Sequence, residues 1–458
     1  MGFLERFYKP CRLSMPDQSK SKSPRGAHDP YSAFREPAFR RFTLAGLVVQ
    51  IGTGAQSVAI GWEIWVRTQN PMALGLLGLV QALAMLLFTL PAGYFADIFD
   101  RRRLMLLGMI GTTLTSLALA VFSYMQGAIA VMFVLLFFDA TALRLTGPAR
   151  TALVPLLVPK DKLENAMKWR ASLSQISAVV GPAIGGFIIV WSIPFAYLFC
   201  ALSTAIFMLV LMTIHVPDAV RAVPGKMVSQ VLEGISFVWH RKVILGTISL
   251  DLFAVLLGGA VYLLPIFVTE IIDVRAVGLS EEQALGWLRA APAIGALLMA
   301  LWLAHAPPFR HAGRTMLWSV AGFGAAIIVF GLSSNLWLSM AMLLLSGAFD
   351  NVSVVVRHTL VQLLTPNELR GRVSAVNAIF IGSSNEIGGF RAGAVASVFG
   401  PVISVVAGGI GTLAVVAAWA GLFPNLRRFR ALSDASATMD PIPPGRRSDT
   451  PVKPPRRE

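Results

Sequence analysis

Residues 138–167 read FDATALRLTGPARTALVPLLVPKDKLENAM, and residues 349–374 read FDNVSVVVRHTLVQLLTPNELRGRVS. The two stretches align with each other and bring Arg150 onto Arg357, roughly two hundred residues further along a chain of 458. Each copy follows an apolar run that occupies the same place in its half of the chain. The sequence is therefore an internal duplication, and it predicts two halves with the same order of elements.

The composition predicts that both halves lie in a membrane. Hydrophobic residues make up 55% of the chain and charged residues 14%, and the mean hydropathy is +0.67. Soluble domains carry about 25% charged residues. The 40 glycines and 27 prolines also suit membrane helices better than soluble ones. We therefore expect an integral membrane protein.

A helix needs about 20 apolar residues to cross a bilayer, and the chain offers twelve such runs. We expect an all-α protein of two pseudo-symmetric six-helix halves, residues 42–214 and 243–423. A tail (1–41), a linker (215–242) with an amphipathic stretch at 227–240 and a disordered basic tail (424–458) complete the chain. The predicted spans are 42–66, 72–96, 104–123, 128–146, 171–191, 194–214, 243–269, 283–304, 315–332, 337–356, 373–398 and 400–423.

The 39 lysines and arginines are placed asymmetrically. They gather in the two tails and in every second loop, whereas the intervening loops carry only Arg67 and Arg275. The positive-inside rule puts the basic loops and both termini in the cytoplasm. The polar start of the chain predicts no cleavable signal peptide. Because the net charge of +15 comes from loops and tails, we expect no nucleic-acid partner.

Several enzyme and cofactor classes are excluded by missing motifs. The sequence has two cysteines and six scattered histidines, no phosphate-binding GxxxxGK[ST] motif and no HExxH motif. We predict no catalytic residue, no metal site and no cofactor. Two parallel six-helix halves instead favour a secondary transporter, with a substrate site near the bilayer midplane between the halves.

The segment after the second span reads GYFADIFDRRR from Gly93. It resembles the signature loop of the major facilitator superfamily, although Ile98 and Asp100 replace a basic residue and a glycine. The resemblance implies that this loop clamps the cytoplasmic ends of the halves together through charge pairs, with Arg150 as the candidate partner of Asp97. The predicted cytoplasmic gate consists of Gly93, Asp97, Arg101, Arg102, Arg150 and Arg357.

The likeness continues over roughly residues 38 to 430. The run that ends in LPAGYFADIFDRRR, the GPARTALVPLLV turn and the TPNELRGRVSAVNAIFIGSSNEIGGF run are similar to the transmembrane secretion effectors, the bacterial branch of the enterobactin exporter. The fifth span also carries a GPxxGG pattern similar to a motif of exporters, formed by Gly181, Pro182, Gly185 and Gly186. Close packing of helices on small residues is the alternative explanation of that pattern.

Two acidic side chains inside the spans are the candidates for proton coupling. Glu386 lies roughly 20 Å deep in the eleventh span, where desolvation favours the neutral, protonated carboxyl. A structural hydrogen bond to a neighbouring span is the alternative. Asp251 lies roughly 12 Å from the cytoplasmic face, where it relays protons or pairs with an arginine.

Other intramembrane charges are candidates for the substrate cavity. Asp139 and Asp350 occupy equivalent places in the fourth and tenth spans, which favours a shared structural role. Arg289 and Arg391 either face the cavity, where they favour anionic substrates, or extend outward to the membrane surface. We expect Arg144 to extend to the cytoplasmic surface in the same way, and Glu63 to lie at the outer interface.

We read the chain as an exporter in a bacterial cytoplasmic membrane. It would move a small amphipathic organic molecule, drug-like or siderophore-like, outwards in exchange for protons by alternating access. Its expected partners are this substrate, protons and the lipid bilayer; no protein partner is identified. Uptake, uncoupled diffusion of a small solute, and a transporter-like sensor or assembly partner without flux are the alternatives.

Overall fold

The computed structural model describes residues 29–215, 227–307, 309, 311–366 and 369–428. The first half is a bundle of six long helices, and proline at the first or second position starts three of them, α1, α2 and α6. In chain order they are α1 Pro37–Thr68, α2 Pro71–Ile98, α3 Arg101–Tyr124, α4 Ile129–Leu153, α5 Leu163–Trp191 and α6 Ile193–Thr213.

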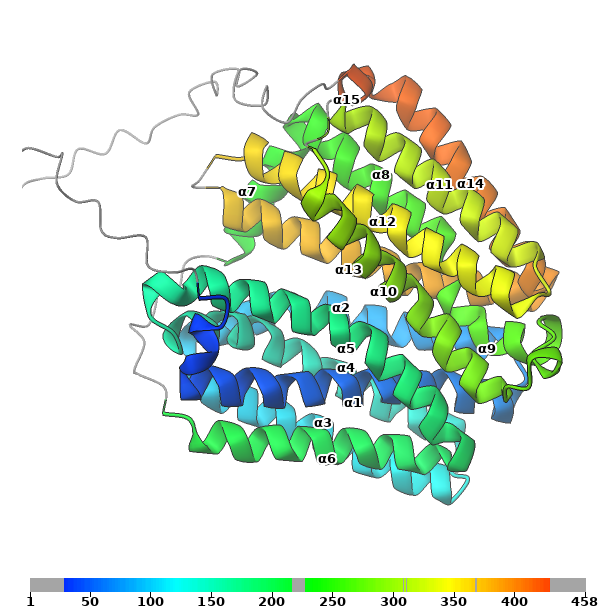
Figure 1. The fold of residues 1–458 in the computed structure, drawn as a ribbon, viewed down its shortest axis with the longest axis horizontal. Coiled ribbons are helices and arrows are strands. Elements are labelled where there is room, and N and C mark those ends of the chain that lie inside the picture. Colours follow the sequence, from blue (N-terminus) through cyan, green and yellow to red (C-terminus); the bar gives the residue numbers. More distant parts are fainter. Residues whose placement is uncertain (1–28, 216–226, 308, 310, 367–368, 429–458) are drawn as a thin grey trace, which may run out of the picture.

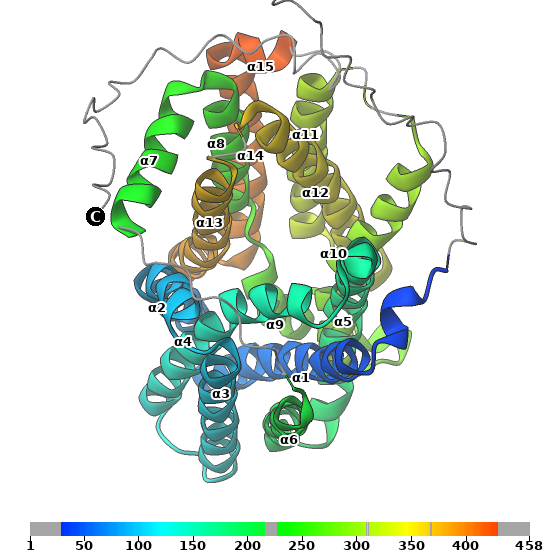
Figure 2. The same ribbon diagram turned by 90° about the vertical axis from the view of Figure 1, so that its left-hand side faces the viewer.

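The second half packs above the first in Figure 1 and repeats its order of long helices. Figure 2 turns the view to look along the bundle, so that most helices are seen from their ends. The helices are α7 Met227–His240, α8 Lys242–Gly258, α9 Leu264–Ile266, α10 Glu281–His305, α11 Ala312–Leu332, α12 Leu336–Leu364, α13 Arg370–Phe399, α14 Pro401–Leu422 and α15 Pro424–Arg428.

Eleven helical segments of the described residues are long and apolar enough to cross a membrane. The prediction was twelve. The missing segment, 373–398, is present as α13 and has 30 residues, but its polar side chains, among them Asn377, Asn385, Glu386 and Arg391, lower its hydropathy. Because α13 packs against α2 and α8, protein surrounds much of its length. It therefore completes the bundle without the hydropathy of a lipid-facing helix.

The seventh predicted span is not one continuous helix. α8 ends at Gly258, and after Gly259 and Ala260 the chain continues through a 3-10 turn (Val261–Leu263), the short α9 and a π-helical turn (Phe267–Ile271). A pair of glycines is a common place for a membrane helix to break. The break leaves backbone carbonyls without donors inside the helix, and side chains from α10 and α13 donate to them instead.

The described parts of the two tails are short. Residues before α1 include a 3-10 turn, Ser32–Arg35, which is held to α5 because the side chains of Asn165 and Trp169 donate to the Pro30 carbonyl, both at 2.8 Å. After α14 the chain forms α15 within the segment predicted to be disordered. The remainder of both tails lies outside the described residues.

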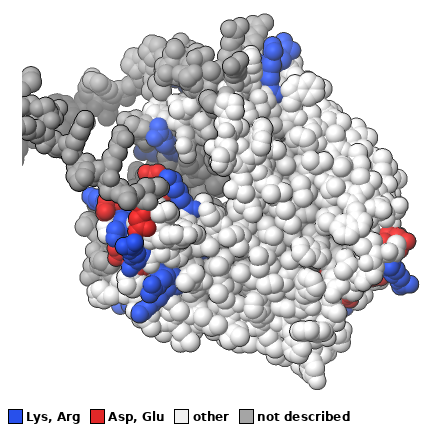
Figure 3. All heavy atoms as spheres, in the orientation of Figure 1, with Lys and Arg blue, Asp and Glu red and all other residues white. Residues whose placement is uncertain are grey.

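Charged residues gather at one end of the bundle. Figure 3 shows most of the coloured lysines, arginines and carboxylates at the end where α1 begins, a wide uncoloured band and a small group at the far end. We call the first end the basic face; Arg101, Lys162, Lys242 and Arg372 belong to it. We call the other end, with the turns at Asn70 and Ser280, the opposite face. The uncoloured band is the part that fits a bilayer core.

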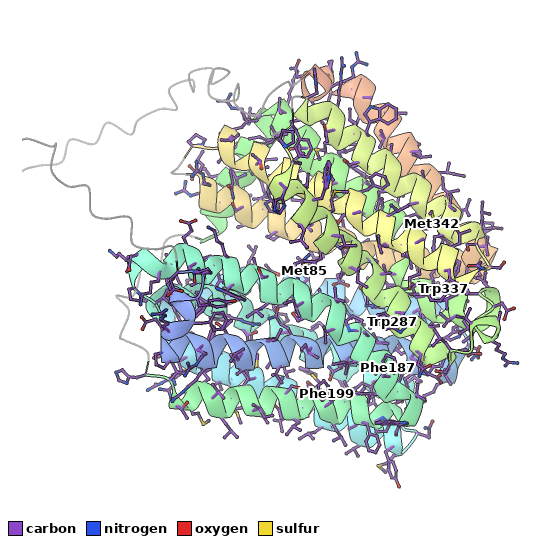
Figure 4. All side chains as sticks on the ribbon, in the orientation of Figure 1. Met85, Phe187, Phe199, Trp287, Trp337 and Met342 are labelled. Atoms are coloured by element: carbon purple, nitrogen blue, oxygen red, sulfur yellow. The ribbon has the colours of Figure 1, made fainter. Side chains whose placement is uncertain are left out.

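The two halves meet mainly toward the opposite face. The Trp65 indole N–H donates to Thr269 Oγ1 at 2.9 Å across the seam, and Phe187 of α5 meets Trp287 of α10 edge-on with ring centroids 6.4 Å apart. Figure 4 shows Phe187 and Trp287 close together at this seam, with Met85 further toward the middle of the bundle. These contacts between the halves close the structure at the opposite face. At the basic face, by contrast, the pair of Lys162 with Glu36 lies within the first half.

The predicted amphipathic stretch forms α7, which lies at the outer edge of the second half beside α8 and α13 in Figure 2. Gly234 approaches the α13 backbone at Arg372 closely, and Glu233 forms an ion pair with Arg372 at 2.5 Å. Leu232 and Trp239 are exposed on the outer face of α7. The helix is thus fixed to α13 by Glu233 and Gly234 and packs Val238 into a hydrophobic cluster with α8, α12 and α13, whereas Leu232 and Trp239 point outward.

Candidate functional site

Glu386 of α13 lies in the middle of a contact between the two halves. The Tyr262 hydroxyl, just after the break in the seventh span, donates to Glu386 Oε2. Arg144 of α4 reaches from the first half to within 3.6 Å of Glu386 Oε1. The Glu386 side chain is 13% exposed and that of Arg144 36%. Arg144 was expected to extend to the membrane surface, but the structure aims it at Glu386 instead.

Two further arginines belong to the same region and hold the broken helix. Arg289 donates from Nη1 to the Val261 carbonyl at 3.3 Å, and Arg391 donates from Nη2 to the Leu257 carbonyl at 2.5 Å. These carbonyls flank the break after Gly258. A backbone group without a partner is costly in a bilayer, so the two guanidinium groups stabilise the break. Neither of the two placements weighed for them from sequence describes this role.

Tyr262 is the residue of this cluster that the sequence did not assign. Its place follows from the helix break, because the turn at Val261–Leu263 directs the chain toward α13. The signal in the sequence is the pair Gly258-Gly259 followed by Pro265. Arg289 also lies close enough to interact electrostatically with Glu386 and Tyr262. The carboxylate therefore has one hydroxyl donor and two cations around it.

Asp139 is the centre of a buried network in the first half. Gln56 of α1 donates to its Oδ2 at 3.1 Å, and Thr115 of α3 donates to its Oδ1 at 2.8 Å. Ser116 donates in turn to the Gln56 side-chain carbonyl at 2.7 Å. The network joins α1, α3 and α4. Asp350, at the matching place in α12, is partly exposed, and no hydrogen bond to its carboxylate is found in the described part of the chain.

Asp251 and Arg357 are brought together in the second half. The Arg357 guanidinium forms an ion pair with Asp251, and both side chains are almost completely buried, at 2% and 4% exposure. One residue was predicted for proton coupling and the other for the cytoplasmic gate. They form a single unit that joins α12 to α8.

The other residues predicted for the gate lie within the first half. Arg150 donates to the Gly46 carbonyl at 3.3 Å, Arg101 to the Ala152 carbonyl at 3.2 Å and Arg102 to the Met212 carbonyl at 2.5 Å. Gly93 belongs to α2, which extends to Ile98, so the signature segment is mostly helical. The side chain of Asp97, and with it the predicted pair with Arg150, lies outside what the structure describes.

The departure from the signature at Asp100 has a structural use. Its carboxylate caps the N-terminus of α3 by accepting from the Arg103 backbone N–H at 2.9 Å. Aspartate is a favourable residue at this position of a helix. The connection between α2 and α3 consists of Phe99 and Asp100, and the cap allows α3 to begin directly after it.

The GPxxGG pattern of α5 packs against two other helices, α1 and α10. Gly181 approaches Gly54 of α1, and Pro182 lies beside the same glycine. Gly185 approaches Ala55 of α1, and Gly186 approaches Gly286 of α10. Small residues permit such close approach of membrane helices. The pattern therefore packs α5 against its own half and against the other half.

A second cluster of charge lies in the first half near the opposite face. Glu63, expected at the outer interface, is 1% exposed. It accepts from the Tyr197 hydroxyl at 2.8 Å and from Arg67 at 3.0 Å, and Arg67 also donates to the Gly127 carbonyl. The cluster ties α1 to α6 and to the turn before α4.

Comparison with known proteins gives one consistent result. The family model described as "Transmembrane secretion effector" matches residues 28–447. The chain is 26% identical over 405 residues to the enterobactin exporter EntS of Shigella boydii serotype 18, covering 86% of this chain and 94% of that one. It is also 26% identical over 410 residues to the enterobactin exporter of an Escherichia coli O1:K1 strain, with the same coverage.

Solved structures of low sequence identity share the fold. A D-xylose–proton symporter aligns with a TM-score of 0.63 at 14% identity, over 86% of this chain and 98% of that one. A bacterial homologue of the iron transporter ferroportin, solved in an inward-facing state, aligns with a TM-score of 0.65 at 15% identity, over 86% and 99%. The expected architecture of two six-helix halves is confirmed.

Proposed function

The chain belongs to the transmembrane secretion effector family of the major facilitator superfamily and is a transporter rather than an enzyme, and from this we propose that it exports a small amphipathic organic molecule in exchange for protons. The class of molecule is drug-like or siderophore-like. The relatives that bear the name enterobactin exporter match over nearly their whole length, which supports the outward direction.

The proposed setting is a bacterial cytoplasmic membrane, with the basic face and both termini in the cytoplasm. The positive-inside rule supports this orientation, because Arg101, Lys162, Lys242 and Arg372 all belong to one face. With the seam closed at the opposite face, the site between the halves is then reached from the cytoplasm. This is the state in which an exporter takes up its substrate.

The observation that carries the proposal is the contact of Glu386 with Arg144. One residue is on α13 and the other on α4, so the ion pair joins the two halves in the middle of the bundle. A proton on Glu386 removes the charge that attracts Arg144 and weakens that link, whereas the Tyr262 hydroxyl remains in place. Proton binding at this one carboxyl therefore changes how the halves are held, as exchange by alternating access requires.

The test uses everted membrane vesicles with an imposed pH gradient and a panel of dyes, antibiotics and catecholate siderophores. Wild type is compared with Glu386→Gln, and with Glu164→Gln as the matched control, because the Glu164 side chain is 81% exposed on α5. Accumulation that requires the gradient, is lost in Glu386→Gln and persists in Glu164→Gln supports the proposal.

Other outcomes separate its parts. Accumulation that survives in Glu386→Gln retains the exporter and removes Glu386 as the coupling site. Accumulation that is indifferent to the gradient indicates an uncoupled facilitator. Absence of accumulation in vesicles of both orientations contradicts export and favours a role without flux.

A further inference from the structure

One face of α1 carries a stripe of hydrogen-bonding side chains. Gln50, Thr53 and Ser57 follow one another at intervals of three and four residues and therefore share a face of the helix, which Ile60 continues. From Gln50 to Ile60 the stripe extends about 15 Å along the helix axis. Polar groups inside a membrane bundle are costly unless they have partners or line a water-filled cavity.

The stripe lines two adjoining cavities. A cavity of 330 Å³ lies toward the basic face, and one of 280 Å³ lies deeper beside Arg144. Thr53 belongs to the lining of both, so the two form one groove along α1. The remaining polar residues of the lining come from α1, α2, α4 and α5, all in the first half: Gln50, Gln56, Ser57, Gln81, Asp139, Arg144, Ser174 and Ser177.

The kind of group that lines the groove limits what it can bind. Organic cations are recognised by aromatic rings or carboxylates, and among the described residues of the lining there is no aromatic ring. Asp139 is the carboxylate of the lining, and both of its oxygens already accept from Gln56 and Thr115. The more exposed charge of the lining is the guanidinium of Arg144, and the carboxylate that pairs with it, Glu386, is not among the described residues of the lining.

The hydroxyl and amide groups favour a different ligand. Ser57 donates to the Gly54 carbonyl and Thr53 to the Gln50 carbonyl of their own helix, so their oxygens remain able to accept a hydrogen bond from a ligand hydroxyl. The amide of Gln50 donates once, to the Gly46 carbonyl, and accepts once, from Ser174, so one donor and one acceptor site remain for a ligand. A row of such groups suits a molecule with several hydroxyls.

We propose that this groove is the substrate site and that it takes a hydroxyl-rich organic molecule, uncharged or anionic, which lies along α1 from Gln50 to Arg144. The proposal rests on the proposed function and narrows its substrate class: the siderophore-like alternative fits, and the lipophilic cation does not. The second half contributes Glu386 at the deep end through its pair with Arg144, while the first half supplies the groups that recognise the substrate.

Equilibrium binding to the purified full-length protein, without any gradient, tests the proposal. The hydroxyl-rich probes are enterobactin and dihydroxybenzoate, and the cationic probes are ethidium and tetraphenylphosphonium. The variants are Thr53→Val and Gln50→Leu, which remove groups of the stripe. Thr359→Val is the matched control, because in the described part of the chain that hydroxyl donates to the Val355 carbonyl of its own helix, and the residue is partly exposed on α12.

We expect saturable binding of at least one hydroxyl-rich probe, weakened roughly 3- to 10-fold by Thr53→Val and unchanged by Thr359→Val, with no saturable binding of either cation. Three results would overturn the proposal. The first is binding of a cation by wild type, and the second is binding of neither hydroxyl-rich probe. The third is that both Thr53→Val and Gln50→Leu bind the probe with the affinity of wild type. Because no gradient is applied, failure of export or of proton coupling leaves this measurement unaffected.

Discussion

Arg357 of α12 and Asp251 of α8 form an ion pair that is almost completely buried in the second half. The equivalent arginine of the first half, Arg150, reaches α1 as Arg357 reaches α8, and there it donates to the Gly46 carbonyl. The two equivalent arginines thus each connect helices of their own half. In the second half the connection is an ion pair between two almost completely buried charges.

Removing the carboxylate of this pair should destabilise the protein. Asp251→Ala leaves Arg357 buried without its counterion, which costs about 3–5 kcal/mol. The double variant Asp251→Leu with Arg357→Met should recover most of the loss, because no buried charge remains. Thermal unfolding in detergent measures both. The control is Glu164→Ala, which breaks an exposed pair with Lys168 and should change stability by less than about 1 kcal/mol; Asp251→Ala unfolding at the wild-type temperature would contradict the expectation.

The buried charge near the opposite face gives a second prediction. Tyr197→Phe removes the hydroxyl that donates to Glu63 and should lower the free energy of unfolding by about 1–3 kcal/mol, since a buried charged acceptor loses a partner. Tyr124→Phe, at a tyrosine that is 81% exposed, should leave stability unchanged. Chemical denaturation of both variants decides the point, and equal midpoints would show that Glu63 does not depend on Tyr197.

The close approach of the two halves at Gly186 and Gly286 gives a third prediction. A leucine at position 186 would meet the Gly286 backbone, and overpacking by about 1–3 kcal/mol shifts the equilibrium between closed and open seam by roughly 5- to 150-fold. The measurement uses a Ser57→Cys variant without the native cysteines and a membrane-impermeant maleimide added on the side of the opposite face. We expect the thiol to react faster when Gly186→Leu is also present than when it is absent.

The control for this experiment is Gly421→Leu on α14, where nothing lies close to an added side chain. That variant should leave the labelling rate unchanged. If Gly186→Leu also leaves it unchanged, the seam at this glycine pair does not decide which side of the bundle is open.

How far the sequence predicts the fold depends on what a local pattern contains. The duplication around Arg150 and Arg357 and the apolar runs predict the twelve long helices well, because apolar length and internal repetition are local properties. The break after Gly258 was missed, since apolar content continues unchanged across it to Phe267. Hydropathy measures transfer into lipid and has no term for backbone bonds that side chains elsewhere replace.

Local sequence patterns are limited in the same way at the candidate site, where they do not predict which charged side chains meet. Depth along a helix singles out Glu386 as a candidate, but the partners of a charge depend on helix rotation, which the sequence alone leaves open. Arg144 and Glu63 were expected near membrane surfaces because they lie close to span ends, yet each points inward to a partner. Pairing across helices that are distant in the chain is decided by packing.

The arginines at the helix break give the last prediction. Arg391 donates to the Leu257 carbonyl, so Arg391→Met leaves that carbonyl without this partner inside the bundle and should cost about 1–3 kcal/mol of stability. Arg391→Lys keeps a donor and should lose less. Thermal unfolding measures the stability of both variants. The control is Arg314→Met, which changes an exposed arginine at the start of α11. Amide hydrogen exchange of residues 255–263 reports on the break itself. Faster exchange confined to this segment in Arg391→Met would identify the guanidinium as its support, whereas wild-type exchange and stability would show that the broken helix holds itself.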